Sequence, residues 1–177
     1  MAFWVFGYGS LLWNPGFEAA EKRPAVLKDF HRSFCMLSIH HRGSEEEPGL
    51  VLALDTAKGG QCTGVAFRIP EAEEDAVLAM LRERELISSA YYEDTLALTL
   101  DDGRQVDALC YIINRDHRQY VQYDLETQAQ MIARSVGGRG PNPEYLYNTA
   151  AHLDEMKIRD DDMNWLVTRV KEISGAH

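Results

Sequence analysis

The sequence predicts an α+β fold, in which helices flank a small mixed β-barrel or sheet. Strand-like segments fill the first two-thirds of the 177 residues, and helical segments fill the last third. Strands and helices do not alternate strictly, as they would in a doubly wound parallel sheet. A chain of this length suits one hydrophobic core, so we expect a single domain over residues 1–177.

The predicted strands begin near the N-terminal end of the sequence. Residues 3–8 are a short aromatic and β-branched run that ends in Gly-Tyr-Gly-Ser, which indicates a strand leading into a loop. Residues 26–39 form a longer strand-like segment, followed by a polar loop. Two hairpins are then predicted around glycine-containing turns: residues 50–55 with 62–69 around Lys58-Gly59-Gly60, and residues 91–100 with 104–113 around Asp101-Asp102-Gly103.

A first helix is predicted between these two hairpins. It starts near Pro70, and its acidic first turn suits the positive end of the helix dipole. Its apolar stripe consists of Val77, Met80 and Leu81. The pattern therefore predicts a helix with one buried face.

Three further helices are predicted in the last third. Residues 125–136 form the first of them, which we expect to end at Gly137-Gly138. Asn142 is a good N-cap for the next helix, with Pro143 at its first position. Residues 160–162 cap and start a final amphipathic helix, whose apolar residues include Trp165, Leu166 and Val170.

Charge and hydropathy narrow the classes of function. The formal net charge of −10 argues against nucleic-acid binding, which usually requires a basic face. A small anionic substrate remains compatible with this charge, because a local site can differ in sign from the whole molecule. The sequence contains no apolar run of membrane-spanning length, and its apolar start lacks the pattern of a secretion signal. We therefore expect a cytoplasmic protein that does not bind membranes; its oligomeric state cannot be predicted.

The three cysteines do not indicate a disulfide framework or a metal site. Cys35, Cys62 and Cys110 are far apart, and each lies in an apolar, strand-like stretch. We expect them to be buried as small hydrophobic side chains rather than to act as catalytic thiols. His40 and His41 are adjacent rather than at metal-ligand spacing, so we expect no metal site.

The loop Gly7-Tyr8-Gly9-Ser10 is the first candidate for chemistry. Two glycines one residue apart allow the backbone to turn tightly and to bring N–H groups close to a ligand. Such a loop can hold a carboxylate or the oxygen of a tetrahedral intermediate. The same residues are equally compatible with a plain turn after a strand.

The second candidate is Glu85, in the segment Arg82-Glu83-Arg84-Glu85. Residues 83 and 85 are about 200° apart on a helix, so one carboxylate can point inward while the other stays in water. An inward Glu85 would be partly desolvated, which raises a carboxyl pKa and suits a base near neutral pH. The alternative is a solvated helix face. Residues 86–90 are predicted to be a loop that could close over a site.

The third candidate is Tyr145, one turn into the predicted helix that follows Asn142. Its hydroxyl could face a neighbouring cavity, although the segment 139–146 also fits a loop and helix cap with no further role. A serine hydrolase is not expected, because neither Ser10 nor Ser44 lies in a GxSxG elbow.

These segments, taken in order, resemble the ChaC family of glutathione-specific γ-glutamylcyclotransferases. The resemblance extends over nearly the whole chain and rests on these stretches: residues 4–13 (WVFGYGSLLW), His41-Arg42-Gly43, residues 48–52, residues 64–68, Arg84-Glu85 before Tyr91, Asn142, Glu144-Tyr145-Leu146 and the final helix with its acidic start. One departure lies at residues 86–90, where many relatives have glycines.

The resemblance implies a γ-glutamylcyclotransferase-like fold and a lyase that degrades glutathione to 5-oxoproline and Cys-Gly. It implies that Glu85 is the catalytic acid–base residue and that Tyr145 lies at the substrate pocket. It also implies that the substrate-binding loop consists of Val5, Phe6, Gly7, Tyr8, Gly9 and Ser10. The implied reaction requires neither a metal nor an organic cofactor.

Two alternatives stay open from the sequence. The chain could act on other γ-glutamyl amines or amino acids, or it could be a non-catalytic small-ligand-binding regulator of cation transport. Arg42, Arg68 or Arg139 could pair with a substrate carboxylate, since arginine offers a planar fork to such groups. The sequence does not choose among these three, nor does it decide whether Glu83 supports Glu85.

Overall fold

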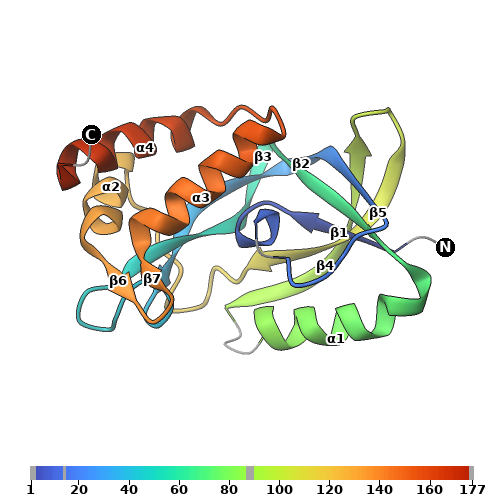
Figure 1. The fold of residues 1–177 in the computed structure, drawn as a ribbon, viewed down its shortest axis with the longest axis horizontal. Helices are drawn as coiled ribbons and strands as arrows, with labels where there is room; N and C mark the ends of the chain where they lie inside the picture. The colour runs from blue at the N-terminus through green and yellow to red at the C-terminus, as the bar shows by residue number, and fades with distance from the viewer. Residues whose placement is uncertain (1–2, 14, 87–89, 176–177) are drawn as a thin grey trace. The chain divides into compact units, whose positions relative to one another are not determined.

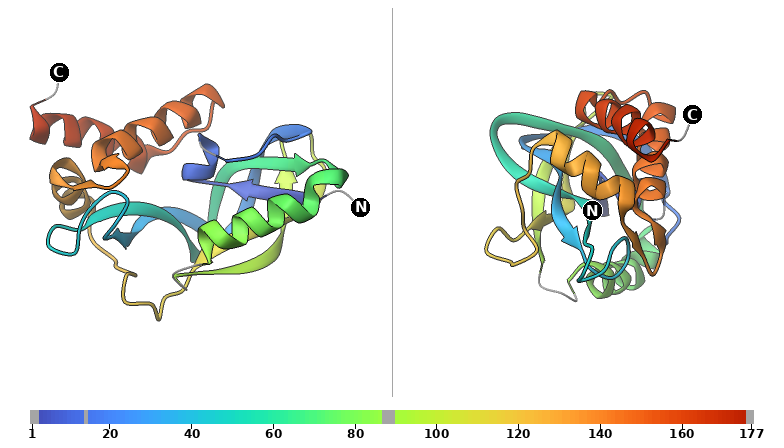
Figure 2. Two further views of the ribbon diagram at one scale, coloured as in Figure 1. Left: turned by 60° about the horizontal axis from the view of Figure 1, so that its bottom comes forward. Right: turned by 90° about the vertical axis from the view of Figure 1, so that its left-hand side faces the viewer.

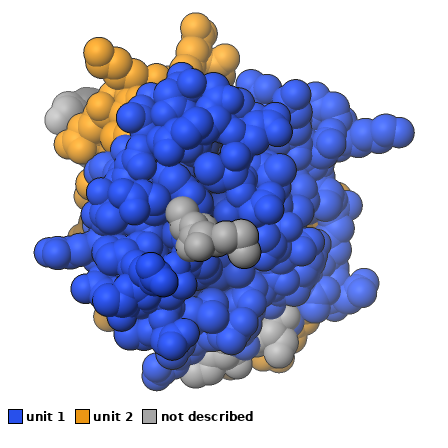
Figure 3. Space-filling view, turned by 90° about the vertical axis from the view of Figure 1, so that its right-hand side faces the viewer, with its two compact units in different colours: residues 1–32, 53–117 blue, residues 33–52, 118–177 orange. Residues whose placement is uncertain are grey.

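The computed structural model describes residues 3–13, 15–86 and 90–175, and over these residues it confirms the predicted α+β class (Figure 1). Its main sheet is a closed barrel with the strand order β1-β3-β2-β4-β5. The chain divides into two compact units, coloured in Figure 3: unit 1 comprises residues 1–32 and 53–117, and unit 2 comprises residues 33–52 and 118–177. Whether the two form one domain, as expected from the chain length, stays a prediction.

Unit 1 contains most of the barrel. Its strands are β1 (Phe3–Gly7), the first part of β2 (Glu21–Ser38), the later part of β3 (Gly49–Ile69), β4 (Tyr91–Leu100) and β5 (Gln105–Ile113). β1 runs antiparallel to β3, with Gly7 opposite Val65, and parallel to β5, with Trp4 opposite Ala108. β1 therefore lies between two strands, which positions the loop that follows it.

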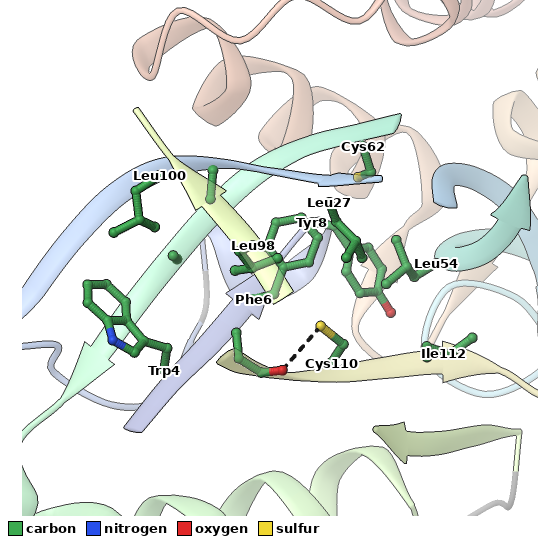
Figure 4. Close-up of a cluster of buried hydrophobic side chains, with 13 residues drawn as sticks. Trp4, Phe6, Tyr8, Leu27, Leu54, Cys62, Leu98, Leu100, Cys110 and Ile112 are labelled. Atoms are coloured by element: carbon green, nitrogen blue, oxygen red, sulfur yellow. Dashed lines mark hydrogen bonds between the residues drawn. The ribbon is translucent and has the colours of Figure 1, made fainter. Parts of the chain in front are cut away.

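Side chains that alternate along the strands fill the barrel. Trp4, Phe6 and Tyr8 point inward from the β1 segment, and Cys110 and Ile112 point inward from β5 (Figure 4). The intervening residues face the other side of the wall. All three cysteines are buried, as the sequence predicted.

The first predicted hairpin is wrong, whereas the second is confirmed. β3 runs as one strand through Lys58-Gly59-Gly60. Gly59 has a φ of +80°, and a Cβ on Gly60 would lie 3.1 Å from the Ala57 carbonyl oxygen, so the strand is bent there rather than ended. The Gly59 N–H donates to the carboxylate of Asp29 at 3.0 Å, which holds this bend as in a glycine bulge.

Helix α1 (Glu74–Glu85) follows a short 3₁₀ turn, η2 (Glu71–Glu73), and lies alongside the barrel strands of unit 1 (Figure 2). Of the predicted stripe, Val77 and Leu81 are buried and Met80 is half-buried. Arg82 donates two hydrogen bonds to Glu93 on β4, which ties the helix to the barrel. The last turn of α1 carries Glu85.

Unit 2 is mainly helical. Its elements are α2 (Leu125–Arg134), α3 (Asn142–Glu155), α4 (Asp161–Ser174) and two short paired strands, β6 (Val136–Gly137) and β7 (Gly140–Pro141), together with the end of β2 and the start of β3. Asp160 caps α4 as predicted, because its carboxylate accepts a hydrogen bond from the N–H of Met163 at 3.0 Å.

Three details of unit 2 correct the sequence-based expectations. α2 ends at Arg134 instead of Val136, because Val136 and Gly137 pair as a strand. Asn142 begins α3 without capping it; its side chain instead bonds both the N–H and the C=O of Leu50, at 2.8 Å each. Trp165 is 42% exposed, so it does not belong to the buried face of α4.

Within the described part of the chain, no helix combines the length and apolarity needed to cross a membrane.

Candidate active site

The glycine loop follows β1 directly. The chain leaves the strand at Gly7, turns at Gly9 and enters a 3₁₀ turn, η1 (Ser10–Leu12). The N–H of Leu12 in this turn donates to the Gly9 carbonyl oxygen at 2.9 Å. This bond leaves the earlier N–H groups of the turn without an acceptor inside it. The side chains of Val5 and Phe6 are fully buried, so these two residues can offer only backbone groups to a ligand.

The orientation of the loop is set by hydrogen bonds from residues far along the chain. Arg32 donates to the carbonyl oxygens of Tyr8, at 2.9 Å, and of Thr63. Because the C=O and N–H of a trans peptide point in opposite directions, the Gly9 N–H points away from Arg32. The Tyr8 hydroxyl donates to the Tyr111 carbonyl at 3.1 Å, which holds its ring inside the barrel.

Glu85 is the last residue of α1, and its side chain is only 14% exposed. Glu83 is exposed, so the two carboxylates face different environments, as their angular separation predicts. Burial raises the pKa of Glu85 above its ordinary value of 4.5, and the nearby Arg84 partly opposes this rise. A raised pKa makes this carboxylate a stronger base than an ordinary, solvated glutamate.

Arg84 connects Glu85 to the glycine loop. Its Nε lies 3.4 Å from Oε1 of Glu85, and its Nη2 donates to the hydroxyl of Ser10 at 2.9 Å. One guanidinium group therefore contacts both the candidate acid–base residue and the loop. Sequence analysis assigned Arg84 no part in the site; it appeared only in the charge pattern of the helix and in the Arg84-Glu85 stretch that resembles the family.

The buried tyrosine Tyr111 also lies near Glu85. Tyr111 on β5 is 1% exposed, and its hydroxyl donates to Oε1 of Glu93 at 3.0 Å. Burial raises the pKa of the Tyr111 phenol, and the negative charges of Glu93 and Glu85 raise it further. Arg82 lowers the pKa of Glu93 by hydrogen bonding to it, although burial opposes this effect. The neutral phenol of Tyr111 therefore interacts with two acids, Glu93 and Glu85, and with Arg82.

Sequence reasoning missed Tyr111 and Glu93, although one signal could have found them. Asp101-Asp102-Gly103 is the turn of the confirmed hairpin, and its register places Glu93 opposite Tyr111. Cross-strand partners have their side chains on the same face of the sheet. Placing the register on the sequence would have put an acid beside a buried phenol.

Tyr145 belongs to unit 2, where its surroundings are well defined. It is buried, its hydroxyl accepts a hydrogen bond from the N–H of Leu52 at 3.1 Å, and its ring meets Phe34 edge-on. The guanidinium of Arg42 lies 5.9 Å from the centre of the ring. Its predicted contact with substrate stays a prediction.

The arginines considered for carboxylate binding have protein partners or backbone contacts. Arg42 is buried and bonds the Pro141 carbonyl at 3.0 Å and Glu144 at 3.2 Å, whereas Arg68 pairs with Glu21 at 3.3 Å. The N–H of Arg139 donates to the His41 carbonyl at 2.9 Å.

In the expected closing loop at 86–90, residues 87–89 lie outside the described residues.

Comparison with known proteins extends over both units. The family model for ChaC-like protein matches residues 3–173. The chain is 38% identical over 174 residues to a glutathione-specific γ-glutamylcyclotransferase of Escherichia coli strain K12, covering 96% of this chain and 73% of that protein. It is 32% identical over 180 residues to γ-glutamylcyclotransferase 2-3 of Arabidopsis thaliana, covering 98% of this chain and 90% of that protein.

Solved structures agree with this assignment at the level of the fold. The crystal structure of a yeast γ-glutamylcyclotransferase specific to glutathione superposes with a TM-score of 0.89 at 23% identity, covering 99% of this chain and 98% of that chain. A structure titled γ-glutamyl cyclotransferase matches with a TM-score of 0.61 at 15% identity, covering all of both chains. The family match, the sequence relatives and the shared barrel lead to one conclusion: the chain belongs to the ChaC-like protein family.

Proposed function

We propose that this protein is a glutathione-specific γ-glutamylcyclotransferase, which releases 5-oxoproline and Cys-Gly, with Glu85 as its acid–base residue. The family and its relatives support the reaction. The observation that carries the assignment of Glu85 is a buried carboxylate, with a raised pKa, that one arginine connects to the glycine loop. We also propose that the protein acts on glutathione, a small-molecule substrate, in the cytoplasm.

The reaction is an internal displacement within the γ-glutamyl group. Its α-amine attacks its own side-chain carbonyl carbon, a five-membered ring closes, and the bond to the cysteine nitrogen breaks. The protein must deprotonate the α-ammonium, hold the chain bent, stabilise the oxyanion and protonate the leaving amine. Correct orientation for such an internal attack supplies on the order of 7–11 kcal/mol.

Glu85 takes a proton from the α-ammonium and later returns one to the departing nitrogen of Cys-Gly. A carboxylate with a raised pKa suits both steps, because a group accepts and releases a proton most readily when its pKa lies close to the working pH. General acid–base assistance of this kind is worth roughly 10²- to 10⁴-fold in rate. The exposed Glu83 takes no part in either step.

Backbone N–H groups of the loop bind the oxyanion. Gly9 is the first choice, because Arg32 holds the carbonyl side of the Tyr8–Gly9 peptide and the N–H faces the opposite way. The loss of one such donor costs roughly 10²- to 10³-fold in rate. Val5, Phe6 and Gly7 fix the strand from which the loop starts, while Ser10 anchors its far end on Arg84.

Tyr145 is proposed to contribute to the substrate pocket as its counterparts in the family do. In unit 2 its hydroxyl accepts a hydrogen bond from the Leu52 N–H, which holds the phenol in a defined position. Replacing Tyr145 with phenylalanine would test this contribution through KM for glutathione.

The central experiment is a product assay with glutathione on three proteins. Wild type and Glu83→Gln are expected to release 5-oxoproline and Cys-Gly at similar rates, whereas Glu85→Gln should lose at least roughly 10²-fold in kcat. Glu83→Gln is the matched control, because it removes the same charge from the same helix at an exposed position. Near-wild-type turnover by Glu85→Gln would refute the role of Glu85.

The same assay separates the alternatives. A non-catalytic regulator of cation transport would release no Cys-Gly from glutathione. A cyclotransferase of other specificity would release 5-oxoproline faster from γ-glutamyl-alanine than from glutathione. The proposed function requires product from glutathione, with γ-glutamyl-alanine as the poorer substrate.

A further inference from the structure

Arg84 makes two contacts that its position on the helix does not explain. Its Nε lies 3.4 Å from the Glu85 carboxylate, and its Nη2 donates to the Ser10 hydroxyl at 2.9 Å. The second contact joins residues 74 apart in the sequence. Its side chain is 22% exposed, against 53% for Arg82 one half-turn earlier.

A solvated surface ion pair would have different features. Pairs that stabilise a helix lie three or four residues apart, whereas Arg84 and Glu85 are neighbours whose side chains leave the helix about 100° apart. An arginine at the end of a helix would ordinarily extend into water and contribute little. Arg84 instead bends toward the loop, where its planar fork contacts a hydroxyl and a carboxylate together.

We propose that Arg84 is a positioning residue that joins Glu85 to the glycine loop, so that the acid–base carboxylate and the oxyanion donors keep one fixed spacing. This inference rests on the proposed function for its catalytic meaning. The nucleophilic amine and the carbonyl oxygen of one γ-glutamyl group lie only a few bonds apart. An enzyme that handles both must therefore hold its base and its oxyanion donors at a matching separation.

Arg84 also has an electrostatic consequence for Glu85. Among the described residues, the Glu85 carboxylate interacts with the Arg84 cation on its own helix and with the neutral phenol of Tyr111 on β5, while Ser10 on the loop contacts Arg84. Behind the phenol, the charge of Glu93 on β4 is paired with Arg82. Arg84 is thus the nearest cation, and it opposes the effect of burial on the pKa of Glu85.

Three variants separate the two contacts. Arg84→Gln removes the charge and the fork, Arg84→Lys keeps a charge but loses the fork, and Ser10→Ala removes only the hydrogen bond to the loop. All three should lower kcat by roughly 10- to 100-fold, because the carboxylate and the loop lose their common anchor. Only Arg84→Gln should also move the acidic limb of the kcat/KM profile to higher pH, by about one unit.

Thermal unfolding and the pH profile distinguish positioning from a structural role. A structural role would lower the melting temperature and the amount of active enzyme, but would leave the acidic limb where it is in the wild type. If Arg84→Gln turns over glutathione with an unshifted acidic limb, or if Ser10→Ala keeps wild-type kcat, the inference is wrong. The proposed function would still stand in either case.

A second readout does not depend on turnover. The Glu85 carboxyl carbon can be followed by ¹³C NMR during a pH titration, with its signal assigned from its absence in Glu85→Gln. We expect the Glu85 pKa to rise by about one unit in Arg84→Gln and to stay near wild type in Arg84→Lys. An unchanged pKa in Arg84→Gln would overturn the inference, even if wild type failed to release 5-oxoproline and the proposed function fell.

Discussion

Glu85 occupies a position that is unfavourable for the stability of the protein. It is an acid in the last turn of a helix, where the dipole favours cations, and its side chain is largely withdrawn from water. Glu83 also lies in the last turn of the helix, but it avoids the cost of burial because its side chain is exposed. A buried charge with an opposing dipole is typical of a residue retained for chemistry rather than for stability.

We therefore expect Glu85→Gln to be more stable than wild type at neutral pH. The pKa of Glu85 is raised in the folded state, so the folded protein binds its proton more tightly than the unfolded chain does. This stabilising contribution is complete below the unfolded pKa of about 4.5 and is lost as the pH rises through the higher folded pKa. Urea unfolding at about pH 4 and about pH 7.5 should show the variant's advantage only at the higher pH.

Glu83→Gln is again the control, and its stability relative to wild type should change little between the two pH values. An advantage of Glu85→Gln that is equal at both pH values would mean that its origin is not the ionisation of Glu85. A loss of stability at neutral pH would mean that the carboxylate is better compensated than its burial indicates.

β1 and α1 both end at the candidate site, although they come from distant parts of the sequence. β1 is held against β3 at an unusually close approach, because a Cβ on Gly64 would lie 2.4 Å from the Gly7 carbonyl oxygen and 2.9 Å from the Phe6 ring. No side chain larger than hydrogen fits there without moving the end of β1. The position of the glycine loop thus depends on a glycine in a different strand.

Gly64→Ala should consequently reduce both stability and activity. Forcing a methyl group into this contact should cost about 1–3 kcal/mol of unfolding free energy and shift the loop that follows Gly7. The measurements are urea unfolding and kcat for 5-oxoproline release, with Thr63→Ala as the control on the adjacent residue of β3. Wild-type values of both quantities in Gly64→Ala would show that β1 and β3 can separate freely.

Across the barrel, a network of ion pairs centred on Glu21 has the opposite dependence on pH from Glu85. Glu21 on β2 contacts Arg23, Arg68 and Arg104, at 2.6, 3.3 and 2.6 Å. Hydrogen bonds from Arg23 and then Arg104 lower the pKa of Glu21 to about 2. The network joins β2, β3 and the turn just before β5, so it supports the closure of the barrel.

Glu21→Gln is expected to be less stable than wild type at neutral pH, and the difference should shrink in acid. Because the folded pKa lies below the unfolded one, the contribution of Glu21 is present above about pH 4.5 and is lost as the pH falls toward about 2. Unfolding should be followed at low salt, since added salt screens exposed pairs. A deficit of Glu21→Gln that grows as the pH falls would contradict this account.

Much of the local structure was predictable because it depends on residues close together in the sequence. The turn at Asp101-Asp102-Gly103 predicted β4 and β5, and the acidic first turn and apolar stripe predicted α1. The angular spacing of Glu83 and Glu85 predicted that only one of them could point inward. The resemblance of the motifs to ChaC proteins then predicted the fold and the family.

The remaining features depend on contacts between distant segments, which local patterns do not record. Gly59 and Gly60 have the composition of a hairpin turn, yet the carboxylate of Asp29 on a neighbouring strand holds them as a bend in one strand. Asn142 is a residue type that favours N-caps, yet its side-chain amide instead bonds the N–H and the C=O of Leu50. The charge pattern predicts that Arg84 is solvated, whereas in the folded barrel Arg84 lies within hydrogen-bonding distance of Ser10. In each case a polar group has a local and a distant partner available, and only the tertiary structure decides which one it satisfies.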